Sequence, residues 1–148
     1  MKIASHRFWG RRGLMLVLAF LVIQFVPYGR DHVNPPLGAE PAWDSSDTRA
    51  LAKQACFDCH SNETQWPAYS RVAPVSWLIH HDVSEGRAVL NFSEWQRPQE
   101  EATEAAEEVR EGEMPLQVYR LMHAHARLNV TDRERLARGL ERTIGRER

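Results

Sequence analysis

Cys56-Phe57-Asp58-Cys59-His60 is the stretch around which the rest of this chain is expected to fold. Two cysteines separated by two residues, with a histidine directly after the second, form the attachment pattern of a c-type haem. Residues three apart share one face of a helix, so both thiols can reach the vinyl groups on one porphyrin edge and form thioethers. His60 follows at once and can offer a ring nitrogen to the iron as its proximal ligand. The motif therefore predicts one covalently attached haem c.

A pair of cysteines separated by two residues also occurs in sites other than haem attachment. The chain contains only these two cysteines, so no further cysteine competes for them. A redox dithiol, a lone disulfide or half of a zinc site are the alternatives, and a zinc site usually takes a second Cys/His pair. His123 and His125 lie two residues apart, which is not the usual finger spacing. The trailing histidine favours haem, with a haem-free thiol or zinc assembly factor as the alternative from another class.

The N-terminus joins a basic flank to an apolar run. Residues 1–12 are expected to be cytoplasmic and carry no acidic residue, and their four basic residues are Lys2, Arg7, Arg11 and Arg12. Residues 13–29 are uncharged and would span about 25 Å as a helix, at the short end for a membrane. Arginines at both ends can reach the interface. We expect a retained transmembrane signal-anchor, because Pro27-Tyr28-Gly29-Arg30 is a poor cleavage site.

The charge distribution sets the expected topology and partners. Basic residues before the anchor place residues 1–12 inside the cell and the following domain outside, on the periplasmic face of the cytoplasmic membrane. This agrees with the motif, because c-type haem is joined to proteins outside the cytoplasm. The rest of the chain holds 15 basic and 20 acidic residues, a net charge of −5. Without a basic face to neutralise phosphates, a nucleic-acid partner is not expected, whereas a cationic redox partner is compatible.

The remaining chain reads as a linker and one helical domain. Residues 30–44 hold three prolines, which favour an extended spacer, and His32 within it is expected to be solvated. The domain, residues 45–145, opens at Ser45-Ser46-Asp47, which are good N-cap residues. Leu51, Ala55 and Cys59 recur every four residues, which predicts a helix whose apolar stripe faces the core. Further helices are expected at 75–90, 98–110, 116–123 and from a capping box at 131–134 to near 145, with no strand.

A haem iron either binds a sixth ligand opposite the proximal histidine or keeps that position open. Met114 is our preferred sixth ligand, since it follows a helix expected to end at Gly112 and precedes Pro115, which stiffens its loop. A thioether sulfur favours reduced iron and so raises the reduction potential. The alternatives are an open site or one of four histidines: His80, His81, His123 and His125.

Arg87 is the candidate partner of a haem propionate. Its guanidinium matches a carboxylate in a two-pronged geometry. A salt bridge from Arg87 to Glu85 or to the acidic segment around 100–113 is the alternative.

Several stretches together resemble the bacterial haem-binding-domain family, small single-haem proteins with an N-terminal membrane segment and one CxxCH. The resemblance runs from about Gln24 to Ile144. The matching stretches are 24–27 with 34–36, 56–64 with Trp66, Pro67 and Tyr69, 74–77, 81–83 with Gly86 and Arg87, 91–93 with Trp95, and 112–115 with Tyr119 and His123. The resemblance implies haem binding on an all-α, cytochrome-c-like domain. It also implies that Cys56, Cys59 and His60 are haem residues, and supports Met114.

These observations predict an all-α, cytochrome-c-like domain around one covalent haem, preceded by a transmembrane helix. The expected function is one-electron transfer by a membrane-anchored c-type haem protein that is a carrier and not an enzyme. A haem-based sensor or small peroxidase with an open sixth site is the alternative within haem proteins.

Overall fold

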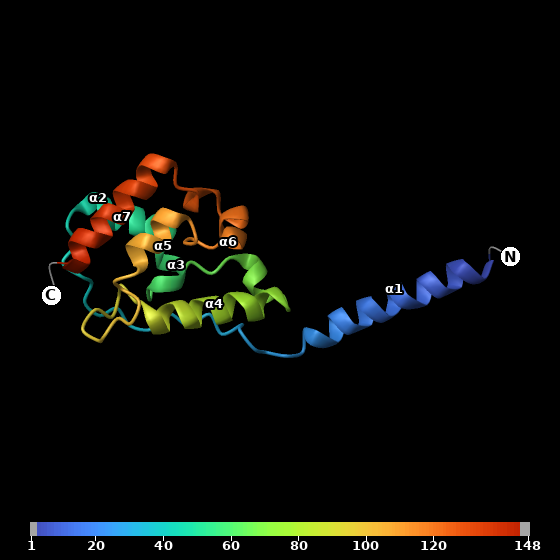
Figure 1. The fold of residues 1–148 in the computed structure, drawn as a ribbon. Helices are drawn as coiled ribbons and strands as arrows, with labels where there is room; N and C mark the ends of the chain where they lie inside the picture. The colour runs from blue at the N-terminus through green and yellow to red at the C-terminus, as the bar shows by residue number, and fades with distance from the viewer. Residues whose placement is uncertain (1–2, 146–148) are drawn as a thin grey trace. The chain divides into compact units, whose positions relative to one another are not determined.

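A computed structural model describes residues 3–145 of the chain, and all regular secondary structure in that range is helical. The elements are α1 (Ile3–Ile23), α2 (Ser46–Ala55), α3 (Phe57–His60), the 3-10 turn η1 (Ala68–Arg71), α4 (Val75–Val89), α5 (Ala105–Glu111), α6 (Gln117–Met122), η2 (Ala124–Ala126) and α7 (Val130–Gly145), as Figure 1 shows. The predicted all-α class is confirmed for these residues. The chain divides into two compact units, of which residues 3–32 with 66–81 and residues 33–65 with 82–145 are described.

The first unit contains the apolar helix α1 and the residues that follow it. The expected membrane-spanning helix at residues 13–29 is not found: α1 ends at Ile23, and across residues 3–145 no helix combines the length and apolar character that crossing a membrane requires. The apolar side chains of this region are exposed, among them Leu16, Val22 and Phe25.

Gln24, the one polar residue in the apolar run, has a structural role. Its Nε2 donates to the carbonyls of Phe20 and Ala73, at 3.0 and 2.9 Å, and its Oε1 accepts the Ala73 amide at 3.1 Å. Arg30 donates to the Gln24 carbonyl at 2.7 Å. The end of the apolar run is therefore fixed to the turn before α4 by paired hydrogen bonds, which satisfy backbone groups that the helix end leaves open.

The sequence predicted a solvated His32, but its side chain has partners within the first unit. Its ring stacks on Trp66 at 4.7 Å between centroids, and its Nε2 lies 3.1 Å from the Ser70 carbonyl and 3.0 Å from the Ser70 hydroxyl. Proline content alone could not reveal these partners, because they come from a part of the chain more than thirty residues away.

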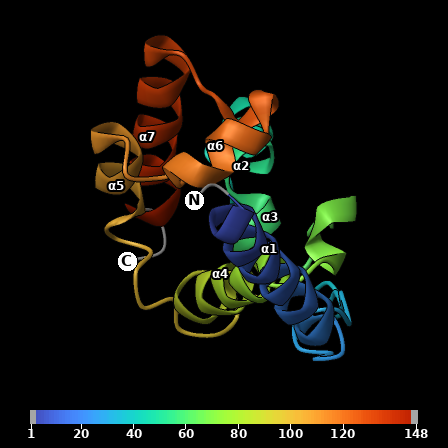
Figure 2. The same ribbon diagram turned by 90° about the vertical axis from the view of Figure 1, so that its right-hand side faces the viewer.

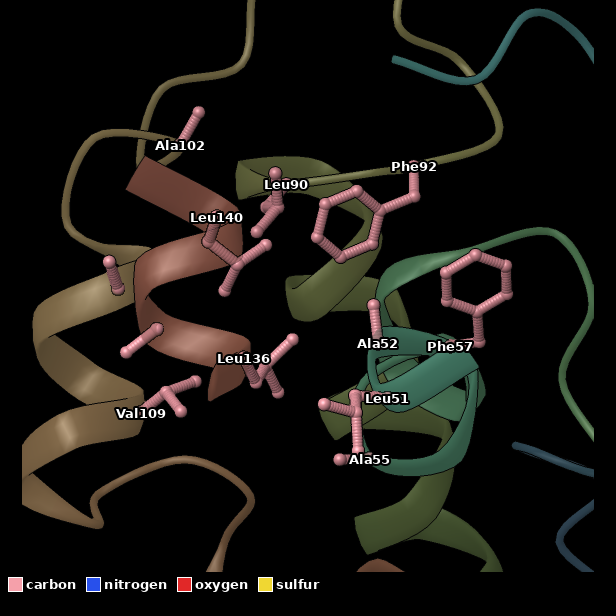
Figure 3. Packing of buried hydrophobic residues seen from close by; sticks show 12 residues of the cluster. Leu51, Ala52, Ala55, Phe57, Leu90, Phe92, Ala102, Val109, Leu136 and Leu140 are labelled. Carbon is pink, nitrogen blue, oxygen red and sulfur yellow. The ribbon is translucent and has the colours of Figure 1, made fainter. Parts of the chain in front are cut away.

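The second unit packs α2, α5 and α7 around one apolar core. Leu136 and Leu140 of α7 are 0% and 1% exposed and lie between Val109 of α5 and the α2 residues Leu51 and Ala55, as Figure 3 shows. The stripes predicted for α2 and α7 are confirmed as core-facing. Burying a leucine of this size stabilises the fold by roughly 2 kcal/mol.

Two predicted helix starts are wrong. α5 begins at Ala105 and not at Pro98, because the Gln99 side chain bonds to backbone, accepting the Asn91 amide at 2.7 Å and donating to the Glu94 carbonyl at 2.8 Å. Such side-chain bonds compete with helix formation. α7 begins at Val130, before the predicted Thr131 cap, since Asn129 Oδ1 accepts the Asp132 amide at 2.8 Å; asparagine is an equally good N-cap.

Aromatic rings extend this core to the CxxCH stretch. Phe57 and Phe92 are 2% and 1% exposed and stack at 5.7 Å between centroids. Trp43 and Trp95 flank Phe92 at 5.1 and 5.9 Å. Because Phe57 lies between the two cysteines, its burial fixes the position of the whole motif on the domain.

Candidate functional site

The CxxCH stretch follows α2 directly and forms the short helix α3. Ser45 caps α2, as predicted, by accepting the Thr48 amide at 3.1 Å. At the other end Cys56 donates to the Ala52 carbonyl at 2.8 Å, and the amide of His60 donates to the Cys56 carbonyl at 2.8 Å. α3 therefore presents Cys56 and Cys59 one turn apart, as the motif requires.

Both cysteines are free and half-buried. Burial raises the pKa of the Cys56 thiol to about 12, and the nearby Cys59 adds to the effect. Burial also raises the pKa of Cys59 to about 12, reinforced by the carboxylates of Asp58 and Asp82 and opposed by Arg87. The sulfurs are therefore neutral thiols at pH 7.

His60 is held with one ring nitrogen available. Its Nδ1 lies 3.0 Å from the Gly86 carbonyl and 3.1 Å from the Leu90 carbonyl. Carbonyl oxygens only accept, so Nδ1 carries the proton and Nε2 keeps its lone pair. Burial lowers the pKa of the imidazole, opposed by these two hydrogen bonds. A neutral, oriented imidazole with its second nitrogen bonded to backbone is the usual form of a metal-ligating histidine.

Gly86 makes the contact with His60 possible, a role that was not predicted from the sequence. A Cβ at Gly86 would lie 2.8 Å from the Cys59 carbonyl oxygen and 3.2 Å from the Cys59 Cβ. The missing side chain lets α4 approach α3 closely enough for the Gly86 carbonyl to meet His60. A glycine inside a helix costs stability. Its presence within the predicted helix at 75–90 could therefore have indicated that another part of the backbone approaches closely there.

Arg87, the predicted propionate partner, braces the same region. Its Nε donates to the Ser61 carbonyl at 2.8 Å, and its Nη2 donates to Asn34 Oδ1 and Thr64 Oγ1, each at 2.8 Å. The guanidinium thus joins α4 to the residue after His60 and to the loop that follows. Its contact with a propionate stays a prediction.

A buried amide pair supports the segment after His60. Asn62 and Asn91 are 3% and 1% exposed, and Asn91 Nδ2 donates to Asn62 Oδ1 at 2.9 Å. Asn62 donates from Nδ2 to Glu94 Oε1 at 2.9 Å, and this bond holds the pKa of Glu94 below its usual value. Ser93 accepts the Asn62 amide at 3.0 Å. Such satisfied polar networks give a core a single arrangement.

Met114 lies directly after α5. The helix ends at Gly112 in the left-handed region, φ 85°, as predicted, and the amides of Glu113 and Met114 donate to the Glu108 carbonyl at 3.0 and 3.1 Å. The Met114 side chain is half-buried and packs against the core. Its backbone is therefore fixed, while its role as sixth ligand stays a prediction.

The four histidines weighed as alternatives lie in different surroundings. In the first unit, His80 stacks edge-on against Tyr28 at 4.9 Å, and its Nδ1 is 3.9 Å from Asp31. In the second unit, His123 stacks on Tyr119 at 4.1 Å and lies 5.5 Å from His125. In residues 3–145 no three His, Cys, Asp or Glu side chains gather where they could hold a metal ion. His81 lies exposed on α4.

The residues present fit a haem. The site offers two neutral thiols one turn apart and an imidazole whose Nε2 lone pair is fixed in direction. In the same unit, exposed apolar side chains suited to an apolar ring line α6 and its approach: Leu116, Val118, Leu121 and Met122. Figure 2 shows α3, α5, α6 and α7 of this unit from a second side.

An all-α unit that presents a CxxCH turn with an oriented histidine defines the class of small helical haem-binding domains. The chain belongs to the family described as Haem-binding domain, whose model matches residues 18–142. Haem is therefore the ligand of this domain, and the family predicted from the sequence is confirmed. No curated protein and no solved structure matches the chain.

Proposed function

We propose that this protein is a membrane-attached c-type haem protein that carries single electrons. The observation that supports this most directly is the pair of carbonyls on His60 Nδ1, which leaves the Nε2 lone pair available to ligate a haem iron. The bound haem iron supplies the one-electron chemistry. The protein's part is to hold the ring, fix its axial ligands and exclude water.

Each residue has a defined part in this proposal. Cys56 and Cys59 would hold the haem through thioethers to its vinyl groups. His60 would ligate the iron through Nε2. Met114 would supply a thioether ligand, which raises the reduction potential. Electron transfer then needs no substrate pocket, which favours a carrier over a catalyst.

Membrane attachment is part of the same proposal. The apolar side chains from Leu14 to Val22 and Phe25 are exposed, and lipid is the partner that such a surface fits. Basic residues before the apolar run favour the haem domain on the outer face of the cytoplasmic membrane. Fractionation of cells followed by protease treatment of spheroplasts tests this. Recovery in the soluble fraction, or protection of the domain inside the cell, would contradict the proposed location.

The test of the electron-carrier proposal is optical. The protein is made in cells with an active haem-attachment system. Its oxidised form is scanned in the far red, and carbon monoxide is added to its reduced form. A carrier with Met114 on the iron shows a methionine–iron band in the far red when oxidised and resists carbon monoxide when reduced. Prompt carbon monoxide or peroxide binding instead supports the sensor or peroxidase alternative and removes the carrier role.

A matched pair of variants tests whether Met114 supplies the sulfur ligand of the iron. Met114→Leu is expected to abolish the far-red band, whereas Met122→Leu, which alters a 61% exposed side chain, leaves it unchanged. Loss of the band in His123→Ala or His125→Ala with retention in Met114→Leu would assign the ligand to a histidine.

A further inference from the structure

α6 is not held in place by burial of its side chains. None of its residues is buried, and Leu121 and Met122 are 67% and 61% exposed. A six-residue helix is too short to be stable by itself. Specific polar contacts must therefore set its position within the second unit.

One such contact joins α6 to the haem-attachment motif. The Tyr119 hydroxyl donates to Asp58 Oδ2 at 2.6 Å, and Asp58 is the residue directly before Cys59. The other carboxylate oxygen, Asp58 Oδ1, accepts the Gln65 amide at 2.9 Å. Both oxygens are thus engaged, and hydrogen bonds to a carboxylate are about twice as strong as neutral ones.

The residues after Tyr119 are ordered around the same contact. His123 stacks on the Tyr119 ring at 4.1 Å, and its Nδ1 lies 3.1 Å from the Tyr119 carbonyl. Gln54 of α2 donates to the His125 carbonyl at 2.6 Å. The segment from α6 to η2 is therefore tied to α2 through Gln54 and to the CxxCH motif itself through Tyr119.

We propose that the Tyr119–Asp58 hydrogen bond is a clamp that holds α6, and with it the Met114-Pro115 loop, against the haem-attachment turn. Tyr119 and Asp58 are then positioning residues for the sixth side of the iron. The part that concerns iron rests on the proposed haem attachment. The clamp itself is a property of the chain.

The clamp has a measurable consequence at the iron. An external ligand such as imidazole reaches the sixth side only when Met114 has moved away, and α6 follows directly after the Met114-Pro115 loop. Loss of the clamp makes this displacement easier. Tyr119→Phe removes the hydroxyl and keeps the ring that stacks on His123, so it isolates the hydrogen bond.

The first experiment measures imidazole binding to the oxidised, haem-loaded protein. Tyr119→Phe is expected to raise imidazole affinity about tenfold, the effect of losing one hydrogen bond to a charged group. Tyr28→Phe, which alters a tyrosine of the first unit, is the matched control and is expected to change nothing. Asp58→Ala removes the acceptor of both the Tyr119 hydroxyl and the Gln65 amide, so it should raise the affinity at least as much as Tyr119→Phe. The double variant should not exceed Asp58→Ala, since the Tyr119 hydroxyl has already lost its partner there. Unchanged affinity in Tyr119→Phe, or additive effects, would overturn the clamp.

The second experiment reads the clamp without reference to haem. Hydrogen exchange is followed in the wild type and in Tyr119→Phe, and faster exchange confined to residues 117–126 supports the clamp. Equal exchange there overturns it. If the wild type is colourless, the proposed haem attachment fails, and this exchange comparison still decides the clamp.

Discussion

Gly86→Ala tests whether the close approach of α4 to the attachment helix sets the histidine geometry. The new Cβ would lie 2.8 Å from the Cys59 carbonyl oxygen and 3.2 Å from its carbonyl carbon. These are backbone atoms that cannot rotate away, so α4 must shift. Overpacking of this kind costs about 1–3 kcal/mol, and alanine returns up to about 1 kcal/mol through its helix propensity. We expect a net loss of up to about 2 kcal/mol in the free energy of unfolding.

The same shift moves the Gly86 carbonyl away from His60 Nδ1, now 3.0 Å distant. The imidazole loses one of its two fixed partners, so the haem spectrum and the reduction potential should change together with stability. Urea unfolding and potentiometric titration of the haem-loaded protein measure the two effects.

Two glycine variants serve as controls. A Cβ at Gly139 would overlap the Thr48 side chain, at the end of α2 away from the motif, whereas a Cβ at Gly13 meets nothing within 4 Å. Gly139→Ala should lower stability and leave the potential unchanged, and Gly13→Ala should change neither. If Gly86→Ala keeps the wild-type stability and potential, the reasoning about His60 is refuted.

Three further substitutions test the supports around the site. Glu40→Gln breaks a two-pronged pair with Arg49, at 2.6 and 2.5 Å, and should cost about 1 kcal/mol at pH 7 because the pair is partly exposed. The hydrogen bond from Arg49 is the main cause holding the pKa of Glu40 below its usual 4.5, so the ionised carboxylate stabilises the fold above pH 4.5. Urea unfolding at several pH values should therefore show that the stability deficit of Glu40→Gln vanishes as pH falls below 4.5. A deficit that stays constant with pH would contradict the assignment. Asn91→Ala leaves Asn62 Oδ1 without its buried donor and should cost about 2–3 kcal/mol in urea unfolding, with a loss under 0.5 kcal/mol speaking against the network. Arg87→Lys keeps the charge but loses the two-pronged geometry, so a fall in melting temperature without loss of haem is expected. An unchanged melting temperature would show that the hydrogen bonds of the Arg87 guanidinium are not needed for stability.

The sequence predicted the features that depend on local pattern. The Ser45 cap, the apolar stripes of α2 and α7, the helix at 75–90 and the helix end at Gly112 all follow from spacing and capping chemistry, and the structure confirms them. The CxxCH motif likewise carries its own chemistry in five residues.

The missed features depend on contacts between distant residues. Nothing around His60 in sequence identifies Gly86 and Leu90 as its carbonyl partners, because they lie 26 and 30 residues away. The Tyr119–Asp58 bond spans 61 residues and leaves no periodic signal. The helix starts at 98 and 131 were wrong because Gln99 and Asn129 bond to backbone in ways that residue type alone does not decide.

The most direct test of the central claim is the mass of the intact protein made where the haem-attachment system is active. We predict a mass increased by that of one haem and a reduced optical spectrum of the c type, both lost in the Cys56→Ala/Cys59→Ala variant. An unmodified mass, with both thiols free to react with an alkylating reagent, would contradict covalent attachment at Cys56 and Cys59.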